Sequence, residues 1–333
     1  NPLGTGPYSL EDGIGGKHLQ RVVNWWCSSD DLVAKDSSIA LVEAESPSQI
    51  RDEFEFSGLS VVCTNPQTDS YADYRCDFEL WEVDSGFMMY IGCNVTYSKF
   101  FDDGTLRTFL TYGIDRQTLV DDNYGGLALP TTLPISPMSP YYSKSLATNY
   151  DYDEMRFIDA ASKFRVPTND KGVPRTLQLL VNSDDSARLR CARNIAATLT
   201  ELGLACETVE SPTSVYEARL QAANYDIYLG ITKLPTTADL SEFYRPWGEM
   251  SWGGLANETI YNMVNQSLAD RGNYYNLHKL VADDGRIIPV MAGYYAIYAK
   301  RGVLSDLNPA RDNVFYYTLG KTMESSKVAT QFS

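Results

Sequence analysis

The sequence predicts an α/β protein centred on a parallel β-sheet, and three observations within residues 176–232 support this prediction. Three short apolar runs alternate with two stretches of helical periodicity, in the order 177–181, 185–202, 205–209, 215–223 and 226–231. Asn182, Ser183 and Asp184 are typical helix-capping residues, and Gly203 stands where glycine commonly ends a helix. Strands joined through helices in this way lie parallel, with right-handed crossovers.

The chain before this unit is predicted to be rich in strands. The expected strands are residues 6–10, 18–23, 38–44 and 59–63, followed by two strands within 78–94 that bend at Asp84-Ser85-Gly86. A short helix is expected from residue 46 to residue 56, because Pro47 suits a first helical turn. The polar residues 65–74 are expected to form a loop.

The remaining elements are predicted from periodicity and from helix caps. Residues 105–123 are expected to form one helix after Asp102-Asp103-Gly104, because one side is apolar, at Leu106, Phe109, Leu110 and Ile114. The proline- and tyrosine-rich residues 125–152 are expected to be a loop. The other predicted elements are a helix at 153–164, an antiparallel helix pair at 257–271 and 274–282, and an apolar strand at 287–300.

The 333-residue chain has a formal net charge of −15 and a pI near 4.6. This charge argues against binding to nucleic acid or to anionic lipid, because both require clustered lysine and arginine. The acidity fits a soluble, secreted or surface-exposed protein. No apolar run approaches the ~20 residues of a membrane span. No signal peptide opens the chain and Asn1 is not an initiator, so we expect a processed chain or a fragment.

Cysteine and histidine usage argues against metal chemistry. Six cysteines show no CxxC pair and there are only two histidines, His18 and His278, so we predict neither a metal nor a cofactor. Cys63 and Cys76 flank a polar segment, which is compatible with a disulfide and equally with free thiols. The 23 tyrosines and 5 tryptophans suit the walls of a binding site, because their side chains combine apolar area with a polar atom.

Five short motifs follow one another along nearly the whole chain. They are N-P-L-G-T-G-P-Y at residues 1–8, Y-I-G-C-N at 90–94, F-D-D-G-T-L-R with Y-G-I-D-R at 101–116, Y-D-I-Y with D-L-S-E-F at 225–243, and I-P-V with Y-Y at 288–295. In this order they resemble the extracellular solute-binding proteins of peptide and nickel ABC importers, solute-binding family 5. Each motif alone is weak, and the specificity comes from the shared order.

The resemblance implies a two-lobed, periplasmic-binding-protein-like fold of type II, with mixed sheets flanked by helices. Lobe 1 would comprise residues 1–94 and 295–333, and lobe 2 would be an α/β domain inserted at 95–294. In the family, the G-T-G-P-Y strand follows roughly a third of the mature protein. The resemblance therefore implies a chain that lacks the N-terminal third, or an unusually short relative, without the signal or lipobox region.

The site is expected beside the carboxyl ends of the parallel strands, at residues 232–254 and at the two strands that cross between the lobes. The predicted ligand-binding residues are Tyr90, Asn94, Thr236, Asp239, Trp247, Trp252, Tyr294 and Tyr295. Structural alternatives stay open for several of them. The tryptophans would also serve to pin a loop, Asp239 would also cap a helix, and only one of Tyr294 and Tyr295 can face a cleft.

One departure from the family concerns the ligand. Peptide-specific members carry an acidic residue, after a tryptophan, just upstream of the D-P-x-x-F segment, where it grips the free amino group of the peptide. Residues 231–237 read I-T-K-L-P-T-T here, with neither tryptophan nor acid. Glu249 and Asp239 are the candidate partners for a ligand cation, and the alternative for each is a solvated loop acid or, for Asp239, a helix N-cap.

The sequence favours a binding protein over an enzyme. A G-x-S-x-G nucleophile elbow is absent, and two histidines leave little room for histidine-based acid–base chemistry. The resemblance implies the substrate-binding component of an ABC importer, monomeric and working with membrane permease subunits, at the cell surface as a lipoprotein or in the periplasm. We predict that it captures an oligopeptide in an interlobe cleft by hinge closure. The alternatives are an oligosaccharide-binding protein of an importer and a carboxylate-dependent glycosidase.

Overall fold

The computed structural model describes residues 5–13, 15–27, 36–56, 58–66, 74–306, 309, 311 and 320–321. The chain divides into two compact units, residues 1–85 with 295–333 (unit 1) and residues 86–294 (unit 2). The predicted lobe boundaries stay a prediction. The first four residues of the N-terminal motif and most of the tail lie outside the described residues.

Unit 1 contains a small antiparallel sheet in the order β1-β2-β3. Its strands are β1 (Tyr8–Gly13), β2 (Gly16–Arg21) and β3 (Ser38–Ala40), close to the predicted strands. The predicted helix is α1 (Pro47–Phe56), which begins at the proline. β4 (Val61–Thr64) pairs antiparallel with the last residues of β10 (Ile287–Lys300). Two short strands, β11 (Leu304–Asp306) and β12 (Gly320–Lys321), also pair with each other.

Two long strands, β5 and β10, contribute residues to both units. The structure corrects the prediction for residues 78–94, which form one strand, β5 (Phe78–Cys93), instead of two. Gly86 lies in this strand with a φ of 78°. A glycine adopts this left-handed conformation readily, so the backbone changes direction there without ending the strand. The prediction for β10 is confirmed to the residue.

The centre of unit 2 is a mixed sheet in the order β10-β5-β9-β7-β8, with the short β6 (Leu129–Pro130) also paired to β10. β7 (Leu177–Asn182) runs parallel to β8 (Cys206–Ser211) and to β9 (Ile227–Lys233). β5 pairs antiparallel with β9. The three predicted parallel strands are thus confirmed, together with their connecting helices α6 (Ser186–Glu201) and α7 (Thr213–Gln221).

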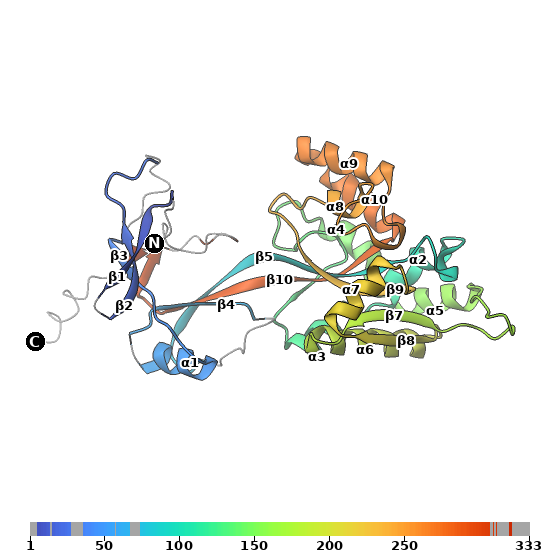
Figure 1. The fold of residues 1–333 in the computed structure, drawn as a ribbon, viewed down its shortest axis with the longest axis horizontal. Helices are drawn as coiled ribbons and strands as arrows, with labels where there is room; N and C mark the ends of the chain where they lie inside the picture. The colour runs from blue at the N-terminus through green and yellow to red at the C-terminus, as the bar shows by residue number, and fades with distance from the viewer. Residues whose placement is uncertain are drawn as a thin grey trace, which may run out of the picture. The chain divides into compact units, whose positions relative to one another are not determined.

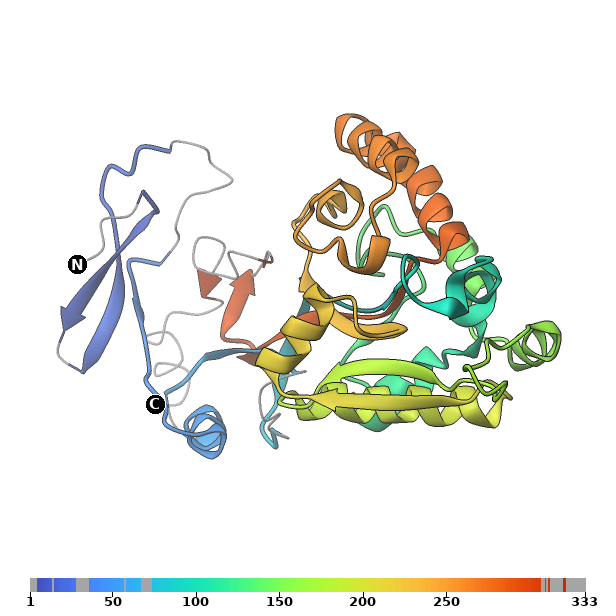
Figure 2. The same ribbon diagram turned by 45° about the vertical axis from the view of Figure 1, so that its right-hand side comes forward.

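Helices cover both faces of this sheet (Figure 1). Successive strand residues point to opposite faces, so Met89 and Ile91 join one core while Met88 and Tyr90 join another. The first core is shared with α6 and α5 (Glu154–Lys163), and the second with α7, α9 (Glu258–Ala269) and α10 (Tyr274–Asp284). Figure 2 shows α6 on one side of the strands and the α9–α10 pair on the other. This is the predicted α/β class, with a mixed sheet between helices.

The structure also corrects the single helix predicted for residues 105–123. The segment forms α2 (Thr105–Phe109), a 3-10 turn η3 (Leu110–Gly113) and α3 (Arg116–Tyr124). Asp115 starts the new helix by accepting a hydrogen bond from the Thr118 amide at 3.1 Å. The buried Arg116 guanidinium donates to the carbonyl oxygens of Thr111, Ile114 and Pro289, at 3.2, 3.2 and 2.8 Å. These bonds hold the interruption in place.

The predicted loop at 125–152 is mostly irregular, and contains only short elements. These are β6, α4 (Lys144–Ala147) and the 3-10 turn η4 (Thr148–Tyr150). All six cysteines lie within the described residues, and Cys76 is a free thiol, so the disulfide between Cys63 and Cys76 is not formed. Within the described part of the chain, no helix combines the length and apolarity that crossing a bilayer requires.

Candidate functional site

The carboxyl ends of the parallel strands lead into the segment Thr232–Gly254, called the wall segment below. It begins with the end of β9 and contains the short helix α8 (Ser241–Tyr244) and the 3-10 turn η5 (Trp252–Gly254). Ligands of open α/β sheets bind beside the carboxyl ends of the strands. The value of this segment as a binding surface depends on how firmly hydrogen bonds and ion pairs hold it.

The first half of the wall segment is held by backbone and side-chain hydrogen bonds. The Leu234 amide donates to the Gly86 carbonyl at 2.9 Å, which continues the pairing of β9 with β5. Asp239 accepts hydrogen bonds from the amide and the hydroxyl of Ser241, at 2.8 and 2.6 Å. This contact keeps the carboxylate at the beginning of α8. The Tyr274 hydroxyl of α10 donates to the carbonyl of Thr237.

The middle of the segment is a turn closed by an ion pair. Arg245 lies 2.8 Å from the Glu242 carboxylate, which also accepts a hydrogen bond from the Glu249 amide at 2.9 Å. The hydrogen bond from Arg245 and that from the Glu249 amide lower the pKa of Glu242. A side chain at Gly248 would lie 2.2 Å from the Glu242 carbonyl oxygen, so only glycine fits this turn.

Trp247 lies at the top of this turn and is 97% exposed. Its φ of 62° is in the left-handed region, which costs a tryptophan of the order of 1 kcal/mol. Because the Trp247 side chain is exposed, its own packing does not offset this strain. The turn thus presents this side chain to solvent.

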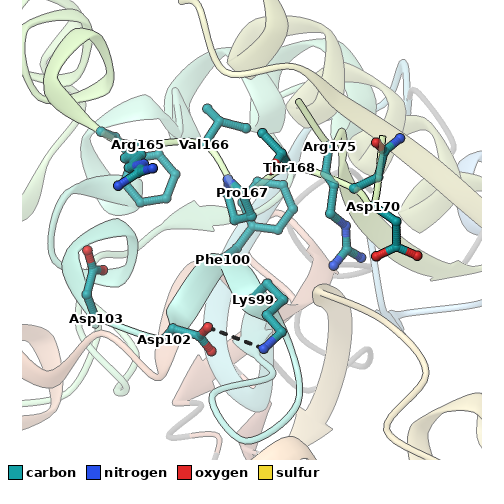
Figure 3. Close-up of a pocket in the computed structure, with 12 residues that line it drawn as sticks. Lys99, Phe100, Asp102, Asp103, Arg165, Val166, Pro167, Thr168, Asp170 and Arg175 are labelled. Carbon is teal, nitrogen blue, oxygen red and sulfur yellow. Dashed lines mark ion pairs between the residues drawn. The ribbon is translucent and has the colours of Figure 1, made fainter. Parts of the chain in front are cut away.

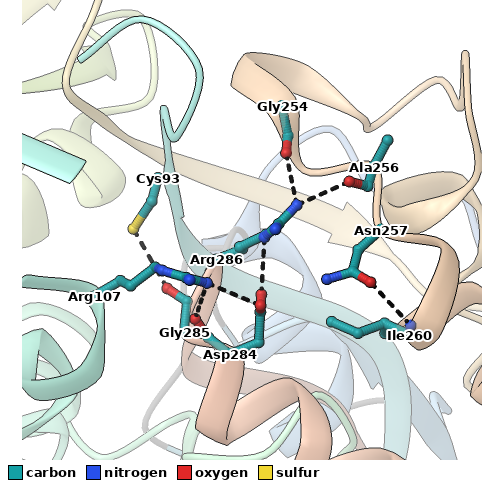
Figure 4. Close-up of polar contacts among 9 residues, drawn as sticks. All are labelled: Cys93, Arg107, Gly254, Ala256, Asn257, Ile260, Asp284, Gly285 and Arg286. Atoms are coloured by element: carbon teal, nitrogen blue, oxygen red, sulfur yellow. Dashed lines mark hydrogen bonds and ion pairs between the residues drawn. The ribbon is translucent and has the colours of Figure 1, made fainter. Parts of the chain in front are cut away.

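The end of the wall segment is clamped by an arginine from the beginning of β10 (Figure 4). Arg286 donates to the carbonyl oxygens of Gly254 and Ala256, at 3.0 and 2.8 Å. Its Nε lies 3.2 Å from Asp284, whose other carboxylate oxygen lies 2.8 Å from Nη1 of Arg107. One carboxylate therefore forms ion pairs with two arginines, and only the contact with Arg107 is also a hydrogen bond. Arg286 in turn fixes the backbone where the wall segment ends.

Gly253 allows the same end to approach β5 closely. An added Cβ there would lie 2.6 Å from the Tyr225 hydroxyl and 2.9 Å from Cα of Asn94. The Gly253 carbonyl accepts a hydrogen bond from the Thr96 amide at 3.2 Å. Asn94 is buried and donates to the carbonyl oxygens of Ala223 and Tyr225, at 2.9 and 2.8 Å. It joins the end of β5 to the beginning of β9.

The predicted site residues differ in accessibility. Thr236 and Trp247 are exposed, Asp239 and Trp252 are half-buried, and all four belong to the wall segment. Tyr90, Asn94 and Tyr294 are buried, and Tyr295 is half-buried. The ring of Tyr90 contacts Phe243 of α8, with centroids 5.1 Å apart, so Tyr90 supports the wall from beneath. A ligand contact by any of these eight residues stays a prediction.

The sequence did not predict the clamp of Arg107, Asp284 and Arg286. The only local signal is the run D-D-G-R at 283–286, which places charges between an amphipathic helix and a fully apolar strand. Charges at such a junction need partners, but their identity depends on residues 177 positions away. Within the described residues, no group of three histidine, cysteine, aspartate or glutamate side chains is arranged to hold a metal ion.

Comparisons with known proteins fit this geometry. The family model described as bacterial extracellular solute-binding proteins, family 5 middle, matches residues 1–254. A comparison with curated protein sequences found no match. Among solved structures, the chain is similar to the ABC transporter substrate-binding protein CtaP from Listeria monocytogenes, with a TM-score of 0.73 at 15% identity. This likeness covers 97% of the present chain and 68% of CtaP.

Two further structures show the range of ligands recorded on this fold. NikA from Brucella suis, in complex with Fe(III)-EDTA, has a TM-score of 0.72 at 15% identity, and the match covers 96% of this chain and 68% of NikA. The oligopeptide-binding protein AppA from Bacillus subtilis, in complex with a nonapeptide, has a TM-score of 0.62 at 15% identity. That match covers 96% of this chain and 66% of AppA. At such identities the likeness establishes the type II binding-protein fold, and not the ligand.

Proposed function

Since the chain belongs to the bacterial extracellular solute-binding proteins of family 5, we propose that it is the substrate-binding component of an ABC importer. It would act outside the cytoplasm and deliver its ligand to membrane permease subunits. The observation that carries the proposal is the wall segment, which begins at the carboxyl end of β9 and exposes Trp247 on a turn that is bonded on both sides. The family and the fold are those of binding proteins.

The ligand class that we propose is an oligopeptide. A pre-formed wall with an exposed aromatic ring and backbone carbonyl and amide groups suits an extended peptide, because such a chain pairs through its backbone. AppA from Bacillus subtilis, which has this fold, was solved with a nonapeptide. This support comes from the shared fold alone. How the ends of the peptide are recognised must be argued from the residues of this chain.

Glu249 is the residue that we propose for the free amino group of the peptide. Asp239 is engaged with Ser241, and Glu242 with Arg245. Within the described residues, the Glu249 carboxylate has no hydrogen bond or ion pair, and it lies two positions after Trp247 on an exposed stretch. Glu249 can therefore accept a ligand ammonium without breaking an existing contact.

The test is a calorimetric titration with a free tetrapeptide, its N-acetylated form, a maltooligosaccharide and a nickel–histidine chelate. We expect binding of the free peptide, a loss of about tenfold on N-acetylation, and the same loss in Glu249→Gln. Glu258→Gln is the matched control, since Glu258 is an exposed acid on α9 outside the wall segment. Equal binding of the free and acetylated peptides would refute the role of Glu249 but not the peptide class.

An oligosaccharide is the second candidate, and the exposure of Trp247 favours it. Sugar rings stack on exposed aromatic faces, and a tryptophan that is 97% exposed offers such a face. Binding of the maltooligosaccharide without binding of any peptide would replace the peptide proposal. Release of reducing sugar during that titration would contradict a binding protein altogether.

A further inference from the structure

A pocket lies beside the amino end of β7, outside the wall segment. It has a volume of about 600 Å³ and is lined by residues 99–100 and 102–103, close to the 3-10 turn η2 (Lys99–Phe101), together with 164–170 and Arg175, from the connection between α5 and β7. Small-molecule sites commonly have volumes of about 300–1,000 Å³. The wall segment contributes no residue to this pocket, so an inference about it does not rest on the proposed transport function.

One wall of the pocket is a turn that is already ordered. The Arg175 amide donates to the Pro167 carbonyl at 2.8 Å, and the Asn169 amide donates to the Val173 carbonyl at 2.9 Å. The Asn169 side chain accepts hydrogen bonds from the amides of Lys171 and Val173, at 2.9 and 3.1 Å. A ligand would therefore meet a pre-formed surface, which lowers the entropic cost of binding.

The pocket has an aromatic floor with arginines on both sides. Phe100 is 1% exposed and forms the floor, and Pro167 lies against it. Figure 3 shows Arg165 and Arg175 on opposite sides of these two rings, with Lys99 below them. The Arg175 guanidinium is 5.9 Å from the centroid of Phe100, within reach of a cation–π interaction. This contact orients the guanidinium along the pocket.

Arg175 is only loosely paired inside the protein. Its Nη2 lies 4.0 Å from a carboxylate oxygen of the buried Asp226, which is too long for a hydrogen bond. Asp226 already accepts hydrogen bonds from the Ser98 hydroxyl at 2.5 Å and from the Gln178 amide at 3.0 Å. Because Asp226 has these partners, Arg175 keeps donors available for a further anion.

The other two cations of the pocket are equally available. Lys99 lies 3.7 Å from Asp102, and both side chains are 66% exposed, a kind of pair that contributes little free energy. The described residues offer the Arg165 side chain no ion pair or hydrogen bond. Three cations in one pocket are notable in a chain with a formal charge of −15.

The balance of the lining decides what kind of anion fits. Three carboxylates, from Asp102, Asp103 and Asp170, also belong to the lining and would repel a compact, highly charged ion such as phosphate. The lining also has an apolar part, which favours a ligand with an apolar body. This part comes from Phe100, Phe164, Val166 and Pro167. A singly charged anion with a ring or a branched apolar body satisfies both conditions.

We propose that this pocket binds a small organic carboxylate with an aromatic or branched apolar body. Its carboxylate lies between Lys99 and Arg175, and its body lies against Phe100 and Pro167. A guanidinium can bind a carboxylate through two parallel hydrogen bonds, which favours this group over a neutral amide of the same shape.

The experiment is a titration, followed by NMR chemical shifts, with benzoate, benzamide and inorganic phosphate. We expect saturable binding of benzoate with a Kd of about 1 mM, and no saturation by benzamide or phosphate. Arg175→Gln should weaken benzoate binding about tenfold. Arg193→Gln is the matched control, since Arg193 is an exposed arginine on α6 outside the pocket, and it should change nothing.

Removing the competing acids gives a test in the opposite direction. Asp102→Asn frees Lys99 and should tighten benzoate binding about two- to threefold, and so should Asp170→Asn, which reduces the repulsion. A misfolded variant would not gain affinity, so these results do not depend on how well Arg175→Gln folds. Equal binding of benzamide, tighter binding of phosphate, or unchanged affinity in the three pocket variants would each overturn the proposal.

Discussion

The wall segment and the pocket beside the amino end of β7 use charged and aromatic residues in opposite ways. At the wall segment, Arg107 and Arg286 share Asp284, while the exposed group is the aromatic Trp247. At the pocket, the aromatic Phe100 is buried, while Arg175 is loosely paired. In the wall segment, the charged side chains hold the backbone in place. In the pocket, the charged side chains remain available to bind a ligand.

This difference shows why a count of charged residues does not locate a binding site. The clamp of Arg107, Asp284 and Arg286 stabilises a wall that presents an aromatic ring and backbone groups, so this wall suits a ligand recognised by shape and by backbone pairing. The pocket suits a ligand recognised by charge. Four changes test the comparison, and they are taken from the largest expected effect on stability to the smallest.

The largest effect is expected from Asp284→Ala. The side chain of Asp284 is 13% exposed, and its loss leaves two arginines without their shared carboxylate. Removing one partner of a buried ion pair typically costs about 3–5 kcal/mol of unfolding free energy. Urea denaturation, followed by circular dichroism, measures the loss.

The matched change at the pocket is Asp102→Ala, which removes one partner of a pair that is exposed on both sides. We expect this substitution to cost no more than about 0.5 kcal/mol. If the two substitutions destabilise the protein equally, the clamp does not hold the wall segment, and the proposed contrast between the wall segment and the pocket is wrong.

The second effect is a loss of stability in acid that depends on His278. This side chain is 1% exposed on α10, its Nδ1 has no hydrogen-bond partner among the described residues, and burial lowers its pKa to about 4. An unfolded histidine titrates near pH 6.5. Because the folded pKa is the lower one, the stabilising contribution is complete above about pH 6.5 and is lost as the pH falls towards 4. The loss reaches about 3 kcal/mol.

His278 lies behind the wall, since its ring is 5.6 Å from that of Tyr274, whose hydroxyl bonds to Thr237. Melting temperatures between pH 7 and pH 4 measure the effect. We expect His278→Leu to flatten this part of the pH dependence and His18→Gln to leave it unchanged. A slope that survives in His278→Leu would assign the acid sensitivity to other groups.

The third effect separates two glycines that are required for different reasons. Gly248→Ala would place a Cβ 2.2 Å from the Glu242 carbonyl oxygen and force the turn below Trp247 to open, at a cost of about 2 kcal/mol. Gly172, in the turn beside the pocket, has a φ of 76° and open space around it. Gly172→Ala should therefore cost only the backbone strain, about 1 kcal/mol. Thermal unfolding of both variants ranks them, and the reverse order would contradict the close packing of the wall turn.

Much of the fold in unit 2 was predictable because its signals are local. The apolar runs at β7 and β9 and the periodicity of α6 each lie within one window of sequence. The long helix predicted at 105–123 failed because its interruption is tertiary. A side chain at Gly113 would collide with Phe157, at 2.6 Å, so this turn is shaped by a helix that comes later in the chain. The apolar periodicity continues across the interruption between α2 and α3, so it predicted one helix there.

The candidate site was predictable in position but not in construction. The carboxyl-edge rule located the wall segment, and its two tryptophans were visible as aromatic residues among glycines. Their different exposure was not visible, since Trp252 packs on the second core while Trp247 is 97% exposed. Nothing local to Arg107 shows that it meets Asp284, and no short motif could have identified the clamp.

The smallest effect on stability is expected at the residue with the most direct proposed role in binding. Trp247 has almost no buried area to lose and is strained at a φ of 62°. Trp247→Gly should leave the unfolding free energy unchanged or raise it by about 1 kcal/mol, because glycine adopts this conformation without strain. Ligand binding at the wall should weaken about tenfold or more, since an aromatic anchor is lost. Benzoate binding at the pocket beside the amino end of β7 should not change. Calorimetric titration of one protein sample with both ligands therefore separates the two sites, and a parallel loss at both would mean that they are not independent.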